Sequence, residues 1–447
     1  MAFKKNPQEI LEGLISSARA LGADAADALL VDAVAASVSY RLGKLEDVER
    51  SESADLGLRV FLGNRVAFVS STDFSADALK ELPARALAMA KLAPEDKYAG
   101  LAPKDRLAKN FPALDTEDPN EPSADTLIER ATAVEAAAMA VKGVTNSEGG
   151  GASFSRSEVA LATSEGFFGR HAGTSHSIGV AVLAGEGTAM ERDYDHASAR
   201  HGSDLDAPEK IGKSAGERTV ARLNPRKVKS QAVPVIYDPR VSAGLVGHFA
   251  GAISGSSIAR GVSFLKDAMG KAVFSKAVTI VDDPHRKRGQ RSKPFDGEGV
   301  ANKKWALAEG GVLTTWLLDC ASAKQLGLQT TGHAARGTGG PPAPSPTNLY
   351  MEPGQLTPEA LMADIKEGLY VTEMIGMGVN GVTGDYSRGA AGFWIENGAL
   401  AYPVSEVTIA GNLTDMYQEL TPANDLVFRY GTNAPTIRVE GMTIAGA

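Results

Sequence analysis

Four stretches of the chain place apolar residues at helical spacing. After Asn6-Pro7, a run of apolar residues lies on one side of a helix that should end near Gly22: Ile10, Leu11, Leu14, Ile15 and Ala18. Proline suits the first turn of a helix, and apolar positions three and four apart share one face. Similar spacing predicts helices over 75–93, 123–141 and 207–223. The first half of the chain is therefore expected to carry helices.

Between these helices the pattern changes to that of strands. Residues 56–62 and 65–69 are rich in apolar and β-branched side chains and are separated by Gly63-Asn64. Two such arms around a two-residue turn predict a β-hairpin. Short runs at 28–31 and 37–41 predict two short strands before it, and 147–200 predicts further strands.

A polar, basic link at 224–230 separates two regions of different character. Beyond it glycine is frequent, and most of the chain reads as short strands joined by turns. Strands are predicted at 311–318, 370–375, 392–396, 404–409 and 436–442, with helices at 240–254, 322–326 and 357–368. We expect an N-terminal α+β domain at 1–225 and a strand-rich C-terminal domain at 226–447. The predicted fold class is α+β, a helix-bearing N-terminal α/β domain followed by a largely antiparallel domain.

Composition narrows the classes of function. The chain has 447 residues, a net charge of −8 and one cysteine, Cys320. An acidic chain without a concentrated basic face argues against nucleic acid, and no apolar run is long enough to span a membrane. One cysteine permits no internal disulfide, and the N-terminus has no signal-peptide pattern. We therefore expect a cytoplasmic protein that binds neither nucleic acid nor membrane.

Short motifs follow one another in a fixed order through the second half. They are Ser263-Phe264-Leu265, Asp282-Asp283-Pro284, Phe295-Asp296-Gly297-Glu298-Gly299, Gly310-Gly311-Val312-Leu313, Thr331-Gly332-His333, Thr347-Asn348-Leu349 and Gly384-Asp385-Tyr386-Ser387-Arg388-Gly389. This order resembles the TldD/PmbA family, the modulator of DNA gyrase family of two-subunit bacterial proteases. The hairpin at Gly57-Leu58-Arg59-Val60 is also similar to the family's Gly-x-Arg-Val.

The resemblance places a zinc-binding helix in only one of the two subunits. In the TldD-type subunit that helix carries His-Glu-x-x-x-His, whereas this chain reads His248-Phe249-Ala250-Gly251-Ala252-Ile253. Phe249 stands where the glutamate general base would be, and a phenyl ring takes no proton. The family's third ligand, a cysteine in a C-terminal loop, has no counterpart at 425–433. The resemblance thus implies a PmbA/TldE-type subunit with no metal or cofactor of its own.

The function implied is that of one subunit of a cytoplasmic zinc metallopeptidase acting on small unfolded peptides. A TldD-type subunit would supply the zinc in a heterodimer, and this chain would be the non-catalytic partner. We assign no catalytic residue and name His248, Arg336 and Asn348 as candidates for the substrate cleft. Arg336 precedes a proline-rich segment, 337–346, which suits the lining of a groove for an extended peptide.

Two alternatives stay open. The chain could be a peptide-binding module without catalysis, alone or as a homodimer. It could also be a self-sufficient enzyme that uses His248, His171 or His196. The pairs His171/His176 and His196/His201 are each five apart, so on a strand their members point to opposite faces and suit a metal poorly.

Three further patterns resemble functional motifs but favour interpretations without a binding or catalytic role. Gly376-Met377-Gly378-Val379-Asn380-Gly381 satisfies a dinucleotide fingerprint, but a glycine-rich loop follows where the motif needs a helix. Ser263-Phe264-Leu265-Lys266 lacks the companion motifs of serine acyl-transfer enzymes. The basic run 285–293 has no interleaved aromatic residues and is expected to be a solvated loop.

Overall fold

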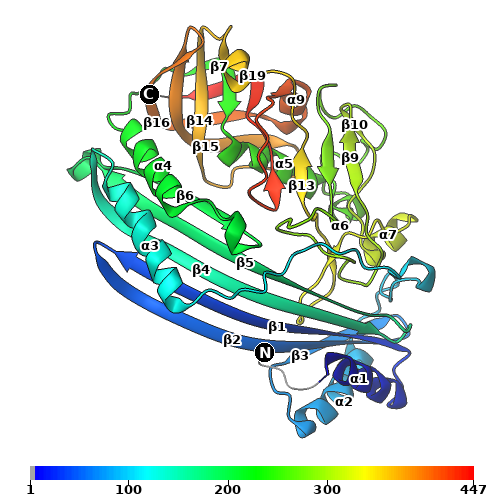
Figure 1. Ribbon diagram of the computed structural model, residues 1–447. Helices are drawn as coiled ribbons and strands as arrows, with labels where there is room; N and C mark the ends of the chain where they lie inside the picture. Colours follow the sequence, from blue (N-terminus) through cyan, green and yellow to red (C-terminus); the bar gives the residue numbers. More distant parts are fainter. Residues whose placement is uncertain (1–5, 447) are drawn as a thin grey trace.

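The structure is a computed structural model that describes residues 6–446. Its first half is built on a six-stranded antiparallel sheet in the order β3-β2-β1-β4-β5-β6 (Figure 1). The strands are β1 (Ala25–Arg41), β2 (Lys44–Leu62), β3 (Arg65–Ser71), β4 (Val144–Thr163), β5 (Phe168–Ala184) and β6 (Glu191–Ala199). The predicted hairpin is confirmed as β2 and β3, and Gly63 in its turn has a φ of +57°.

The prediction of two short strands near the N-terminus is wrong, because both belong to the single long strand β1. The stretch between them, Asp32 to Ala36, pairs with β2 on one side and β4 on the other. Its alanines have weak strand propensity on their own. Hydrogen bonding to neighbours on both edges overrides that preference.

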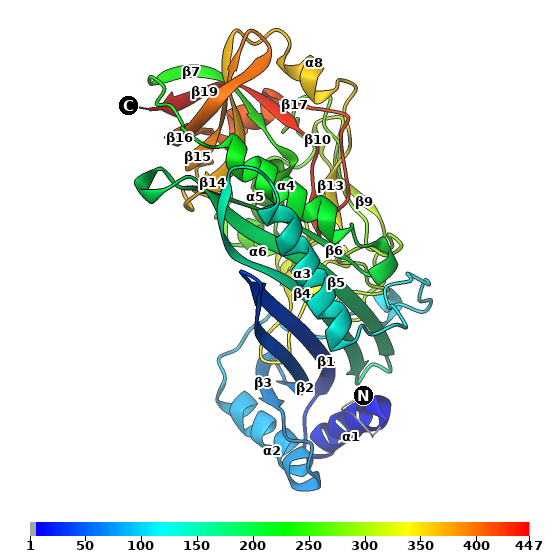
Figure 2. The ribbon, with the colours of Figure 1, turned by 60° about the vertical axis from the view of Figure 1, so that its left-hand side comes forward.

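Two pairs of helices cover one face of the sheet (Figure 1 and Figure 2). Helices α1 (Pro7–Ala20) and α2 (Ala76–Leu92) pack at one end, against a core that includes Leu30 and Leu58. Helices α3 (Ala124–Met139) and α4 (Pro208–Ala221) pack at the other end, against a core that includes Val38 and Ile178. All four helices were predicted from apolar spacing.

The opposite face of the sheet meets the second half of the chain. Leu29 of β1 and Leu161 of β4 share a buried cluster with Phe295, which lies far along the sequence. Alternate residues of a strand point to opposite faces, so β1 contacts its helices through one set and the second half through the other. The sheet therefore belongs to two cores at once.

Beyond α4 the chain crosses the predicted link and enters a second sheet. Its strands are β7 (Gln231–Tyr237), β14 (Glu367–Ile375), β15 (Asp385–Glu396), β16 (Ala399–Asn412), β17 (Leu420–Pro422) and β19 (Ile437–Ala445). The order is β16-β15-β14-β7-β19-β17, and β16 also pairs with β19, so five of these strands close into a barrel. The division into domains at residues 225 and 226 stays a prediction.

A smaller sheet lies beside the barrel, in the order β10-β9-β8-β13-β18. Its strands are β8 (Ile280–Asp282), β9 (Trp305–Glu309), β10 (Val312–Leu313), β13 (Leu349–Met351) and β18 (Thr432–Asn433), and β11 (Ala334–Ala335) pairs with β12 (Ala343–Pro344) separately. The helices of this half are α5 (Pro239–Ala252), α6 (Gly255–Ala259), α7 (Cys320–Leu326), α8 (Pro358–Met362) and α9 (Leu413–Gln418). Short 3₁₀ helices occur at η1 (Lys104–Arg106), η2 (Gly187–Ala189) and η3 (Gly202–Asp204).

Two predicted elements of this half are shorter than expected. The strand at 311–318 is reduced to β10, which ends at Leu313, and farther along the amide of Leu317 donates to the carbonyl of Ile253 at the end of α5. The helix at 357–368 stops at Met362, and β14 starts at Glu367. The predicted α+β fold class is confirmed.

Between residues 6 and 446, no helix is both long enough and apolar enough to cross a membrane.

Candidate functional site

Helix α5 is the element around which cavities gather in the C-terminal half. It begins after Asp238, whose side chain accepts a hydrogen bond from the amide of Arg240, with Pro239 in the first turn. One side of the helix carries Leu245 and Phe249 into the core between the barrel and the smaller sheet. The helix is therefore fixed by its cap and by its apolar side.

The other side of α5 is nearly bare. Gly244, Gly247 and Gly251 are exposed, and a Cβ placed on any of them would meet no heavy atom within 4 Å. His248 is the side chain that stands among them, half-buried. Because positions three and four apart share a face of a helix, these four residues form one surface.

Three neighbouring cavities follow this bare surface. A cavity of about 290 Å³ is lined by Gly247, His248 and Gly251 together with Arg388 of β15. A second, of about 300 Å³, shares His248 and Arg388 and extends to Arg240. A third, of about 430 Å³, shares Arg240 and reaches the loop at 425–436. We call these three cavities together the α5 groove.

The groove is lined by both acidic and basic side chains, and the charged residue that shares both cavities of His248 is Arg388. Burial, and then the positive charge of Arg388, lower the pKa of His248 below its usual range. The imidazole is therefore neutral at pH 7, with its ring edge against Tyr386 at 6.1 Å between ring centroids. Arg240 donates to the Asp193 carboxylate at 2.9 Å, so its charge is compensated.

Arg336, one of the three predicted cleft residues, lies outside the α5 groove. Its side chain is 1% exposed, and its guanidinium lies 2.7 Å from the carboxylate of Asp27 in β1. Arg59 of β2 is bonded to the same carboxylate. Burial by itself would raise the pKa of Asp27, but Arg336 and Arg59 together bring that pKa below its usual range. The position of Arg336 corrects the expectation that it lines a cleft, because it joins the two halves of the protein instead.

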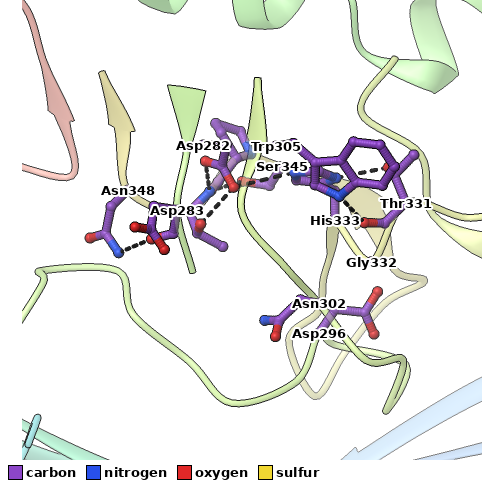
Figure 3. Close-up of polar contacts among 12 residues, drawn as sticks. Asp282, Asp283, Asp296, Asn302, Trp305, Thr331, Gly332, His333, Ser345 and Asn348 are labelled. Atoms are coloured by element: carbon purple, nitrogen blue, oxygen red, sulfur yellow. Dashed lines mark hydrogen bonds and ion pairs between the residues drawn. The ribbon is translucent and has the colours of Figure 1, made fainter. Parts of the chain in front are cut away.

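Asn348, another predicted cleft residue, is also buried. Its side-chain amide donates to the carbonyl of Asp283 at 2.7 Å (Figure 3). Its oxygen accepts from the backbone amide of Arg291 at 2.8 Å. Every polar atom of this side chain is thus used to hold the chain in shape. Asn348 is therefore a framework residue, and of the three candidates only His248 lines the groove.

Motifs that are distant in the sequence converge around Asn348. His333 lies between Thr331, at 2.8 Å, and Asp282, at 3.2 Å, and Thr347 donates twice to the same aspartate (Figure 3). All four side chains are at most 8% exposed. The arrangement contains an acid, an imidazole and a hydroxyl, but burial keeps it from any substrate. These motifs therefore stabilise the interior of the smaller sheet.

The two histidine pairs noted in the sequence lie in and beside strands β5 and β6 of the N-terminal sheet. The Nε2 atom of His176 lies 3.1 Å from the carboxylate of Asp118, and that of His201 lies 3.3 Å from Asp115. His171 packs edge-on against the ring of Phe295. Within residues 6–446, no cluster of three or more histidine, cysteine, aspartate or glutamate side chains has the geometry to hold a metal ion.

The proline-rich segment 337–346 reaches the N-terminal sheet. The hydroxyl of Thr338 donates to the carboxylate of Asp55, and the Thr338 backbone lies so close to Gly57 that a Cβ there would collide with it. Glycine at this position of β2 permits the close approach. The segment is therefore a strap between the two halves.

Sequence reasoning missed the arginines of the groove. In the sequence, Arg388 is one residue of the motif at 384–389, and Arg240 begins the helix predicted at 240–254. Both are ordinary in the sequence, because their place beside His248 depends on barrel closure. The exposed glycines of α5 were the available signal, since glycine in a helix interior costs stability without a local reason.

Comparison with known proteins agrees with this architecture. The chain matches the PmbA/TldA metallopeptidase domains: domain 1 over residues 26–90, the central domain over 117–223 and the C-terminal domain over 230–446. Metalloprotease PmbA of Escherichia coli O157:H7 is 40% identical over 445 residues, which cover 98% of this chain and 97% of that protein.

Solved structures share the whole fold. A crystal structure from Bacteroides thetaiotaomicron, described as a modulator of DNA gyrase, superposes with a TM-score of 0.91 at 27% identity and covers 100% of both chains. TldE of Thermococcus kodakarensis gives a TM-score of 0.86 at 23% identity, over 97% of this chain and 99% of that one, a likeness of fold. The chain belongs to the PmbA/TldD family of metallopeptidases.

Proposed function

We propose that this chain is the PmbA/TldE-type subunit of a two-subunit cytoplasmic peptidase that acts on small unfolded peptides. It shapes the groove that receives the peptide, and a TldD-type partner supplies the zinc and the general base. One observation carries the proposal. Of the three positions 248, 249 and 253, only His248 faces the groove, while Phe249 and Ile253, both 0% exposed, lie in the core.

The residues around His248 do not fit a zinc ion. A catalytic zinc site needs about three protein ligands, usually histidine, cysteine or carboxylate side chains. Here the positions one and five residues after His248 are apolar and buried. Arg388 lines the same two cavities, and its positive charge opposes a divalent cation. No catalytic step is therefore assigned to this chain.

The dimensions of the groove suit an extended peptide. Arg240 and Gly251 stand at its two ends on α5, and eleven helical steps span about 17 Å. An extended chain rises about 3.3 Å per residue, so about five residues fit along the helix. The bare glycines allow a peptide backbone to approach α5 closely.

Mixing experiments test the proposal. A fluorogenic unfolded peptide is incubated with this chain, with the TldD-type protein of the same organism, and with both. Cleavage should appear or rise steeply in the mixture and saturate at one chain per partner. Zinc removed from the partner with a chelator should abolish it.

Two results contradict the proposal. If the partner cleaves equally well without this chain, the subunit role is wrong. If this chain alone captures the peptide, forms a homodimer in light scattering and leaves the partner's activity unchanged, it is a peptide-binding module without catalysis.

A further inference from the structure

Arg388 is a half-buried cation that lacks an anionic partner. Its Nε donates to the carbonyl of Ile375 at 3.4 Å, and it takes part in no ion pair among residues 6–446. The neighbouring arginines differ, since Arg240 is paired with Asp193 and Arg222 with Glu373. A charged side chain that is partly removed from water is costly without a partner.

The cavity beside Arg388 has walls of mixed chemistry. Gly247 and Gly251 of α5 form one wall of this cavity. Its other walls are mostly apolar and include Phe264 and Leu413. His248 is the other titratable side chain in this lining, and it is neutral at pH 7 for the reason given above. The cavity therefore offers one positive charge within largely apolar walls.

The adjoining cavity contains a possible competitor, Glu373. Its carboxylate is held by Arg222 at 2.6 Å and so is not free to neutralise Arg388. Arg240, on the same cavity, is likewise engaged with Asp193. Among the charged side chains that line these two cavities, Arg388 is therefore the one without an ion-pair partner among residues 6–446.

We propose that Arg388, with His248 beside it, binds a carboxylate of the substrate peptide, with the attached apolar side chain lying in the cavity lined by Phe264 and Leu413. A peptide that ends in an apolar residue presents both groups together. The guanidinium bonds a carboxylate through two parallel N–H groups. Where the zinc-bearing subunit holds a cation, this chain selects an anion. The inference rests on the proposed function, because it names the class of peptide that the groove receives.

Labelled peptides test the site. A short fluorescein-labelled unfolded peptide that ends in leucine is compared with its C-terminal amide and with an amide in which glutamate precedes a retained C-terminal leucine. Binding is followed by fluorescence anisotropy, with this chain alone and with the reconstituted complex. The amide should bind about tenfold more weakly than the free acid, or worse. Recovery by the glutamate peptide would identify a side-chain carboxylate as the source, and no recovery would identify the C-terminus.

Variants assign the effect to Arg388. In R388M the free acid and the amide should bind equally weakly, and R388K should lie between R388M and the parent because lysine retains the charge without the planar fork. R41M is the matched control. Arg41 also donates through Nε to a backbone carbonyl, at 2.9 Å, and forms no ion pair among residues 6–446. It differs from Arg388 in its place, because it lies at the end of β1 and outside the α5 groove.

Three results would overturn the inference. One is equal binding of acid and amide by the parent. Another is an unchanged preference in R388M. The third is loss of subunit association in R388M, measured by light scattering, with peptide affinity intact, which would assign Arg388 to the subunit interface. Cleavage by the mixture of the two subunits is measured separately and tests the proposed subunit role. None of these three results changes the outcome of that assay.

Discussion

Two exposed glycines in the middle of helices provide a matched test of the α5 groove. Gly247 lies in α5 and Gly13 in α1, and both helices have 14 residues. Neither glycine has a positive φ, and a Cβ on either would meet open space. The two sites therefore differ chiefly in what surrounds them, because only Gly247 lines a cavity of the groove.

Stability should change alike at the two sites. Glycine in an exposed helix interior is about 1 kcal/mol less favourable than alanine, and about 0.8 kcal/mol less favourable than leucine. G13A, G13L, G247A and G247L should therefore each raise the free energy of unfolding by about 0.5–1 kcal/mol. Urea denaturation followed by far-ultraviolet circular dichroism measures this as an upward shift of the midpoint.

Peptide binding should change at only one site. The leucine side chain of G247L occupies part of the 290 Å³ cavity, so peptide affinity should fall by about tenfold, the effect of an overfilled site. G13L should bind as the parent does. The reasoning is refuted if G247L binds peptide normally, or if G13L loses as much affinity as G247L.

The remaining predictions concern the junction between the two halves. D27N removes the charge that faces Arg59 and Arg336 and should lower the free energy of unfolding by about 3–5 kcal/mol, because two guanidinium groups stay buried without it. The control D47N changes an exposed carboxylate and should alter the free energy of unfolding by less than about 0.5 kcal/mol. Equal urea midpoints for D27N and D47N would contradict a stabilising role of Asp27 between the two arginines. Burial, with Lys293 and Arg200 nearby, lowers the pKa of His171 from 6.5 to about 4. The folded state thus resists a proton that the unfolded state accepts below pH 6.5, so stability should fall between pH 6.5 and pH 4 by at most about 3 kcal/mol. In H171F the free energy of unfolding should fall less between pH 6.5 and pH 4 than it does in the parent, as measured by urea denaturation at a series of pH values.

Local patterns in the sequence predicted the elements whose signals are themselves local. The turn at Gly63-Asn64 and the amphipathic helices α1 and α5 follow from spacing, capping and turn chemistry. The long strand β1 did not follow, because its middle is held by partners that are distant in the sequence. Propensity alone is blind to such pairing.

The candidate site was predicted in part. His248 was found because its position resembles that of a zinc ligand, and the structure turns it toward the groove. Arg336 was expected in a cleft because it precedes the proline-rich segment 337–346, and Asn348 belongs to one of the ordered motifs. Neither signal distinguishes a buried framework residue from an exposed one. Arg388 was overlooked because its solitary charge becomes visible only when every neighbouring carboxylate has been paired.

The zinc content of this chain, purified alone and free of any affinity tag, tests the central claim most directly. Elemental mass spectrometry should find far less than one zinc per chain, because His248 has no second ligand on α5 and faces Arg388. About one tightly held zinc per chain would contradict the account and would make His248 part of a metal site.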